Sequence, residues 1–369
     1  MARILSVVGR LGDHAYPQAE ITAAIAPLIS PEPATQAIVS RLHEACGVRQ
    51  RHLVMPLEWY DDDRTFGQSN GLFIERAAEL ARSALEDALA RAGADVGDVD
   101  CLHFTSVTGI SAPSIDALLV PRMGLRRDLK RVPMYGLGCV GGAAGIARVA
   151  DYLAGHPDDI AVLVSVELCS LTFQRGDDSM GNIVASGLFG DGAAAIVMAG
   201  ERRARRLGLA GPEVVATRSS LYPDSEGVIG FTVGAAGFSV VLTAQVAGLI
   251  ERHLGEDVRR FLGDNGLSIA ELDEWIAHPG GPRVLQAFQH SLELPEGALA
   301  ASWRSLADRG NLSSASVLHI LAETMERPAG TTGLLFALGP GVAAELVLLR
   351  WPGEQGGSPG GNGWPGISR

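Results

Sequence analysis

The chain has 369 residues, 47% hydrophobic and 20% charged, so it can bury one large core or two smaller ones and is not disordered overall. Its formal net charge of −12 argues against a nucleic-acid partner, because a phosphate backbone requires a basic surface. No apolar stretch reaches the ~20 residues of a membrane helix, and the N-terminus lacks a signal peptide's apolar segment, so we expect a cytoplasmic protein without membrane insertion.

The first third of the sequence alternates helical and strand patterns. Apolar residues recur at helical spacing from residue 70 until Gly93, which predicts an amphipathic helix on a core. In the segment VPMYGLGCVGG a strand-like run ends in glycines before a helical pattern. In chain order we expect helix 70–93, strand 99–107, helix 112–123, the strand of VPMY, and helix 143–155.

Two continuous apolar runs, IAVLVSVEL at 160–168 and GAAAIVMAG at 192–200, are typical of strands inside a sheet that helices cover on both faces. They favour an α/β fold. Beyond residue 205 the alternation continues. There we expect helix 239–262, strand 274–278, helices 281–290 and 312–326, and paired strands 331–338 and 342–351.

The two halves of the chain echo each other. Cys139-Val140-Gly141-Gly142 and His278-Pro279-Gly280-Gly281 each place a reactive side chain after a strand and two glycines before a helix. This pattern predicts a duplicated fold, with one half over residues 1–205 and the other over 206–351. Residues 352–369 are rich in Gly and Pro and are predicted to form a tail without a core of its own.

The four cysteines lack C-x-x-C spacing and paired histidines, so no metal site is expected. Cys139 stands out because the N-terminus of the helix that follows it favours a thiolate, the nucleophilic form. It is also small enough to be a packing residue in a crowded turn. Local sequence leaves both interpretations open.

His278 and Asn311 are the other candidates for chemistry. His278 ends an apolar strand, and the Pro and two Gly after it fix a turn that allows close backbone approach. Asn311, in RGNLSSASVL, precedes a helical pattern, so it is either a catalytic amide or simply the N-cap of that helix.

Five motifs together resemble the type III polyketide synthases, the chalcone-synthase-like branch of the thiolase superfamily. They run in order over roughly residues 1–350. The motifs are YGLGCVGGAAGIARVADYL, SGLFGDGAAAIV, IAHPGGPRVL, RGNLSSASVL and LLFALGPGVAAELVLL.

The resemblance implies a homodimer whose subunits have the thiolase-like, duplicated αβαβα five-layered fold. It also implies a triad in a buried cavity: Cys139 carries the acyl chain, and His278 and Asn311 bind the thioester carbonyl. The family's substrates are acyl-CoA and malonyl-CoA, and its chemistry uses no metal or organic cofactor. We expect a Cys139 thiolate supported by His278 as imidazolium, and an enolate, formed by decarboxylation, that His278 and Asn311 stabilise.

Further residues align with the family's cavity and tunnel. Phe189 matches the gatekeeping phenylalanine, and Cys169 and Thr172 match cavity-lining positions. Val240 and Ala112 are smaller than their plant counterparts, which favours a cavity for an aliphatic chain. We therefore expect a fatty acyl-CoA starter and an alkylpyrone or alkylresorcinol product; the alternative is a tetrahydroxynaphthalene-type synthase that uses malonyl-CoA only. Arg49 and Arg51 align near basic residues that contact the CoA phosphates.

Three other classes remain as rivals. A ketoacyl synthase III-like enzyme would condense once, but it usually carries His-Gln-Ala-Asn where this chain has His-Pro-Gly-Gly from His278. A non-catalytic subunit is disfavoured by the intact Cys139, His278 and Asn311. A cysteine hydrolase can use a Cys-His-Asn set, and it would release free acid from acyl-CoA without consuming malonyl-CoA.

Overall fold

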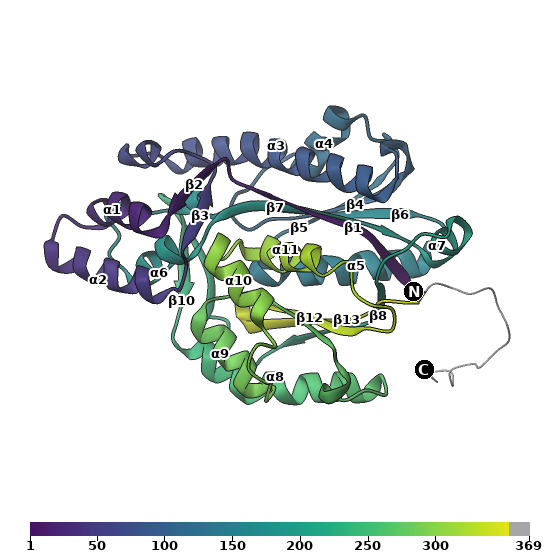
Figure 1. The fold of residues 1–369 in the computed structure, drawn as a ribbon. Coiled ribbons are helices and arrows are strands. Elements are labelled where there is room, and N and C mark those ends of the chain that lie inside the picture. The colour runs from purple at the N-terminus through teal and green to yellow at the C-terminus, as the bar shows by residue number, and fades with distance from the viewer. Residues whose placement is uncertain (354–369) are drawn as a thin grey trace.

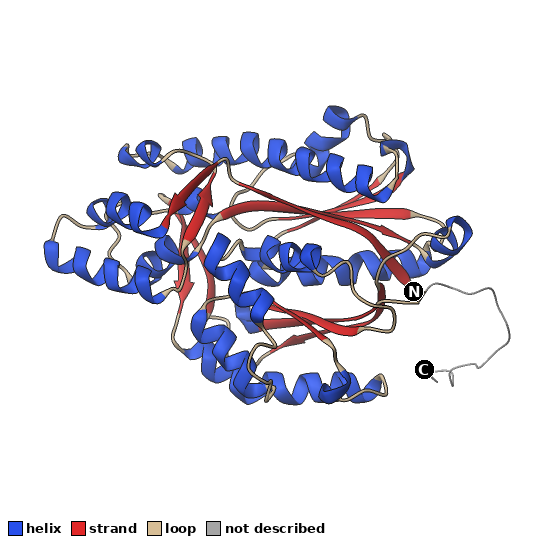
Figure 2. Ribbon diagram, viewed as in Figure 1, coloured by secondary structure: helices blue, strands red, loops and turns tan. Residues whose placement is uncertain are grey.

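Two layers of β-sheet divide the protein, with helices above, between and below them (Figures 1 and 2). The structure is a computed structural model and describes residues 1–353. Strand pairing joins both layers in the order β11-β12-β13-β8-β1-β7-β6-β4-β5. The link between the layers is narrow, because β1 and β8 share only the pairs Ala2↔Val214 and Arg3↔Glu213.

The first layer contains the two apolar runs found in the sequence. All nine residues of β6 and of β7 are buried, as expected for strands covered on both faces. They pair antiparallel along their whole length. The strands of this layer are β1 (Ala2–Leu11), β4 (Val99–Thr105), β5 (Lys130–Met134), β6 (Ile160–Leu168) and β7 (Asp191–Ala199).

The second layer comes from the C-terminal half of the chain. Here β11 pairs parallel with β12, and β12 and β13 form the pair that the sequence predicts, which is antiparallel. Its strands are β8 (Glu213–Leu221), β11 (Glu274–Ala277), β12 (Thr332–Gly339) and β13 (Ala343–Arg350).

Helices complete the five layers (Figure 1). Apolar side chains of α3 (Phe66–Ala92) and α4 (Ile115–Met123) pack on the outer face of the first sheet. Between the sheets lie α5 (Gly141–Gly155) and α11 (Ser316–Glu323), whose side chains share one core with both sheets. The outer face of the second sheet is covered by α8 (Gln245–Asp264) and α9 (Pro282–Ser291), with α10 (Ala300–Arg309) beside β11.

A smaller group of elements gathers at one end of the sheets, at the left of Figure 1. Its core joins α1 with β3 and α6. The group consists of α1 (Gln18–Ile29), α2 (Pro33–Ala45), α6 (Met180–Leu188), the pair β2 (His14–Pro17) and β3 (Gln50–Leu53), and the hairpin of β9 (Ile229–Gly234) and β10 (Gly237–Leu242). This group forms much of the wall of the cavity described below.

Most predicted elements are present, but two of the predicted helices differ. The expected helix 239–262 is wrong at its start: Gly237–Leu242 forms β10, because each of its residues pairs with one of Ile229–Gly234 in β9, and α8 begins only at Gln245. The expected helix 312–326 is the short α11, preceded by a 3-10 turn over Ser313–Ala315.

The expected boundary between residues 205 and 206 falls inside α7 (Glu201–Leu207), and the second layer begins with β8. The predicted tail, 352–369, lies outside the described residues from 354 on. No helix in residues 1–353 is long and apolar enough to cross a membrane.

Candidate active site

Cys139 lies in a tight 3-10 turn, Gly138–Val140, directly before the N-terminus of α5. The turn needs glycine at 138: its φ is +54°, and a Cβ there would lie 2.5 Å from Cδ of Pro340. A Cβ on Gly339 would meet the Leu137 carbonyl oxygen at 2.6 Å. Gly138 and Gly339 therefore let the two loops touch, which places Cys139 at the end of β12 in the second sheet.

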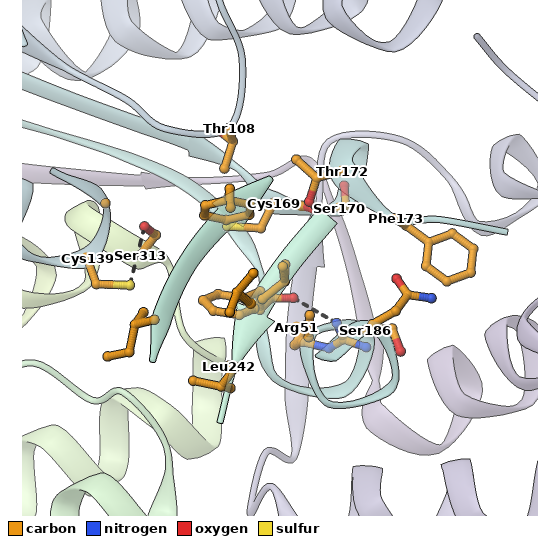
Figure 3. A pocket seen from close by; sticks show the side chains of 18 of the residues that line it. Arg51, Thr108, Cys139, Cys169, Ser170, Thr172, Phe173, Ser186, Leu242 and Ser313 are labelled. Atoms are coloured by element: carbon orange, nitrogen blue, oxygen red, sulfur yellow. Dashed lines mark hydrogen bonds between the residues drawn. The ribbon is translucent and has the colours of Figure 1, made fainter. Parts of the chain in front are cut away.

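The Cys139 thiol is linked to the loop that precedes α11. Its Sγ donates to Oγ of Ser313 at 3.6 Å (Figure 3). Burial, together with the negative charge of Glu167, raises the pKa of the Cys139 thiol to about 12, although its hydrogen bonds with Ser313 and Asn311 act in the opposite direction. In this structure the resting sulfur is therefore a thiol.

Asn311 is held by its own loop. Its Oδ1 accepts from the backbone N–H of Ser313 at 2.8 Å and from Oγ of Ser316 at 3.3 Å. With the oxygen so occupied, the amide nitrogen is the atom left to donate toward Cys139 or a substrate oxygen. The N-cap interpretation is wrong, because α11 follows Ala315 and has no side-chain cap.

His278 follows β11, and its backbone N–H donates to the carbonyl of Phe336 in β12 at 2.9 Å. β11 and β12 are parallel, so their carboxyl ends lie at the same edge of the second sheet. Pro340, which follows β12, packs on the turn that carries Cys139. The ring is 2% exposed, and neither nitrogen has a hydrogen-bond partner within residues 1–353. Burial lowers the pKa of His278 to about 3, so the imidazole is neutral, unlike the expected imidazolium.

A cavity opens beside Cys139 and is bounded by segments that are distant in sequence (Figure 3). Four of the five residues expected to line it do so: Phe189, Val240, Thr172 and Cys169. Other lining residues come from α1, β3, α6 and the β9–β10 hairpin, among them Ile21, Ile25, Arg51, Ser186, Phe231 and Leu242.

Ala112 does not line this cavity. It is exposed in the loop between β4 and α4. Within the described subunit its predicted place at the cavity wall is therefore not seen.

Phe189 is fixed next to Asn311 by the backbone. The N–H of Asn311 donates to the Leu188 carbonyl at 2.9 Å, and the N–H of Gly190 donates to the Asn311 carbonyl at 3.0 Å. Backbone hydrogen bonds thus join the segment of Phe189, in the cavity wall, to that of Asn311.

The two arginines predicted to lie near the CoA phosphates differ in their exposure and in their contacts. Arg49 is an exposed side chain paired with Asp308. Arg51 is 3% exposed and lines the cavity, since β3 alternates and turns it inward with Leu53. Its guanidinium donates to Gln18 and to the Phe189 carbonyl, so a surface position near CoA phosphates is wrong for Arg51.

Glu167 is the site residue that the sequence analysis missed. This fully buried carboxylate at the end of β6 accepts hydrogen bonds from the Val107 N–H at 3.1 Å, from Thr108 Oγ1 at 3.1 Å and from Ser313 Oγ at 3.3 Å. Burial raises its pKa to about 7. Since Ser313 also contacts Cys139, the carboxylate reaches the nucleophile through one hydroxyl. Its signal was a single acid within the apolar run IAVLVSVEL.

Comparison with known proteins now decides the family. Residues 2–201 match the N-terminal domain of chalcone and stilbene synthases, and residues 213–351 match their C-terminal domain. The chain is a type III polyketide synthase, and thus an acyltransferase. Residues 202–212, which lie between the two domain matches, contain most of α7 and the loop before β8, where the chain passes from the first sheet layer to the second.

Relatives and solved structures agree with this family. The synthase is 52% identical over 351 residues to a 1,3,6,8-tetrahydroxynaphthalene synthase of Streptomyces peucetius subsp. caesius, covering 94% of this chain and 93% of that one. It is 33% identical over 283 residues to an alpha-pyrone synthesis polyketide synthase-like protein of Mycobacterium tuberculosis, covering 75% and 72%.

The crystal structure of the 1,3,6,8-tetrahydroxynaphthalene synthase from Streptomyces coelicolor superposes with a TM-score of 0.89 at 30% identity, over 95% of this chain and 99% of that one. The five-layered thiolase-like fold expected from the sequence is thereby confirmed.

Proposed function

We propose that this synthase uses malonyl-CoA as both starter and extender and makes 1,3,6,8-tetrahydroxynaphthalene. The observation that carries the proposal is the 52% identity, over 94% of the chain, to a relative of that name. It favours the malonyl-only alternative over the fatty acyl-CoA starter that the small Val240 and Ala112 predicted.

In the proposed reaction, Cys139 gives up its proton and attacks an acyl-CoA thioester, and CoA leaves. A second malonyl-CoA loses carbon dioxide, and its thioester oxygen becomes an enolate oxygen that the Asn311 amide and a protonated His278 can stabilise. The enolate carbon attacks the Cys139 thioester, so the chain passes to the new CoA ester two carbons longer, and Cys139 is freed for another cycle.

The resting thiol and imidazole are both neutral, so the proton must move when substrate enters. We propose that the His278 imidazole, whose ring nitrogens have no hydrogen-bond partner within residues 1–353, accepts the Cys139 proton. Transfer would produce the thiolate and imidazolium together, each charge offsetting the other in the buried site.

The test is product analysis from malonyl-CoA alone. We expect the purified enzyme to release tetrahydroxynaphthalene, identified by mass and by comparison with a standard. If malonyl-CoA alone gave no product while a long-chain acyl-CoA with malonyl-CoA gave an alkylpyrone, the mycobacterial relative would be the better guide and the proposal would be wrong.

A homodimer is part of the proposal. The edge strand β5 leaves four of its five residues exposed, and the apolar Val132 and Tyr135 are 37% and 54% exposed. An open edge with apolar side chains is a site for pairing with another chain. Light scattering at micromolar concentration should give twice the subunit mass.

We also propose that the enzyme is cytoplasmic. We further propose that it acts on acyl-CoA and malonyl-CoA without a metal or organic cofactor, since the chemistry above uses only side chains of the protein. Dialysis against EDTA should then leave turnover unchanged, and activity lost with EDTA and regained with one metal ion would contradict this.

A further inference from the structure

Arg51 is a buried cation without a carboxylate in contact. Its side chain is 3% exposed, and no acid of the described chain lies within the 4 Å of an ion pair. Burying an unpaired charge is costly, so such a group usually has a partner in some state of the protein.

The guanidinium is only partly satisfied. Its Nε donates to Oε1 of Gln18 at 2.9 Å and its Nη1 to the Phe189 carbonyl at 2.7 Å. Its Nη2 is buried and has no acceptor in residues 1–353. Two of the three guanidinium nitrogens therefore hold the group in place, and the third is left with unused hydrogen-bond donors.

The nearby Asp191 cannot serve as the missing partner of the Arg51 guanidinium. Asp191 is buried and its charge raises the pKa of Arg51, which burial lowers to about 10. Its two oxygens already accept from the Val54 N–H at 2.8 Å and from Ser170. Arg51 remains a cation at neutral pH, and Asp191 does not pair with it.

The position of Arg51 points to the acyl cavity. It lines that cavity together with Tyr60 and Cys169. Cys169 also interacts with Cys139, the residue that carries the chain. Figure 3 shows Arg51 next to Ser186, with Cys139 and Ser313 across the drawn pocket. The other walls near it, Ile21 and Ile25 of α1, are apolar.

We propose that the Arg51 guanidinium binds an anionic oxygen, a carboxylate or an enolate, of the acyl chain in the cavity, and so selects oxygen-rich chains over alkyl chains. This rests on the proposed function, in which every chain is built from malonyl units. A planar guanidinium suits such oxygens because it donates in a fixed fork. Arg51 is then a specificity-determining residue, not a catalytic one.

The experiment compares three four-carbon starters with malonyl-CoA as extender. Butyryl-CoA has no oxygen beyond the thioester, acetoacetyl-CoA adds a keto group that forms an enolate, and succinyl-CoA adds a terminal carboxylate. We expect kcat/KM for at least one oxygen-bearing starter, relative to butyryl-CoA, to fall about tenfold to a hundredfold in Arg51→Met, as for the loss of a hydrogen bond to a charged group. Arg51→Lys should restore part of the ratio, because it keeps the charge.

Two variants of Gln18 distinguish an effect of the Arg51 charge on the kcat/KM ratio from an effect of lost structure. Gln18→Glu places a carboxylate beside Nε and pairs the Arg51 charge internally, so the ratio should fall without removing Arg51. Gln18→Met removes the same hydrogen bond without adding charge, so the ratio should stay near that of the wild type even if the melting temperature drops.

A fall for succinyl-CoA would identify the carboxylate as the bound group, and a fall for acetoacetyl-CoA the enolate. Unchanged ratios for both starters in folded Arg51→Met and Gln18→Glu would overturn the inference. The proposed function is judged separately, by the wild-type product from malonyl-CoA alone.

Discussion

The backbone N–H of Ser313 donates to Oδ1 of Asn311 at 2.8 Å, and this bond sets the orientation of the amide that we propose to be catalytic. With its oxygen turned into the loop, Asn311 presents its nitrogen to the site. Ser313 also contacts Cys139 and Glu167, so one short loop aligns the amide, the thiol and a buried acid.

Asn311→Ala should slow malonyl-CoA decarboxylation about a hundredfold to a thousandfold, the usual effect of losing one donor to a developing oxyanion. Acyl loading of Cys139 should suffer less, because the neutral amide does not take the thiol proton. Carbon dioxide release and intact-protein mass after one turnover measure the two steps. Ser316→Ala is the matched control, since it removes a bond to Oδ1 and leaves the amide nitrogen in place. Full decarboxylation by Asn311→Ala would contradict the role.

Cys139→Ala should abolish polyketide formation but retain part of the decarboxylation, because the thiol carries the chain and the oxyanion donors remain. His278→Ala should impair both steps. Radiolabelled malonyl-CoA, followed as carbon dioxide and as product, separates them. Any polyketide from Cys139→Ala would mean that another group carries the chain.

Val240→Phe should shift products toward shorter chains or earlier release, since Val240 lines the cavity and a phenyl ring there removes space. Thr232→Phe adds the same ring to the exposed part of the hairpin and should leave the product pattern unchanged. Mass spectrometry of all products from one malonyl-CoA incubation is the measurement. If active Val240→Phe gave the same products as the wild type, Val240 would not limit the space in the cavity.

Glu167→Gln should lower the pKa of the Cys139 thiol, because the negative charge of Glu167 raises it. The pH at which iodoacetamide alkylation reaches half its maximal rate should therefore move down. Glu345→Gln, a buried glutamate on β13 bonded to Ser219, tests whether any buried acid has this effect. A midpoint that stayed in place or moved up in Glu167→Gln would show that Glu167 does not act on the thiol.

Glu167 should also make folding stability depend on pH. Its pKa is raised in the folded state from 4.5 to about 7, so the folded protein favours the protonated acid. This stability is complete below pH 4.5 and is lost as pH rises through 7, by about 3 kcal/mol. Glu167→Gln cannot ionise, so its free energy of unfolding relative to wild type should increase across that interval. Urea unfolding at pH 5 and pH 8 measures the difference, and parallel curves would contradict the assignment.

The sequence by itself predicted most of the elements from local features, and it predicted the triad of Cys139, His278 and Asn311 through the family resemblance of its five motifs. Continuous apolar runs predicted β6 and β7, and glycines beside Cys139 and His278 marked turns that only small residues permit. The segment 239–262 failed because Val240 and its neighbours have apolar residues compatible with either period, and pairing with β9 decided for a strand.

Only the tertiary structure decided what surrounds the nucleophile. Arg49 and Arg51 stand two residues apart in one basic segment, yet one is exposed and the other lines the cavity, because α6 and Phe189 pack over β3. Glu167 likewise gains its link to Cys139 from Ser313, 146 residues away. Burial and long-range contacts determine the charge and orientation of these side chains. No local sequence pattern predicts such contacts.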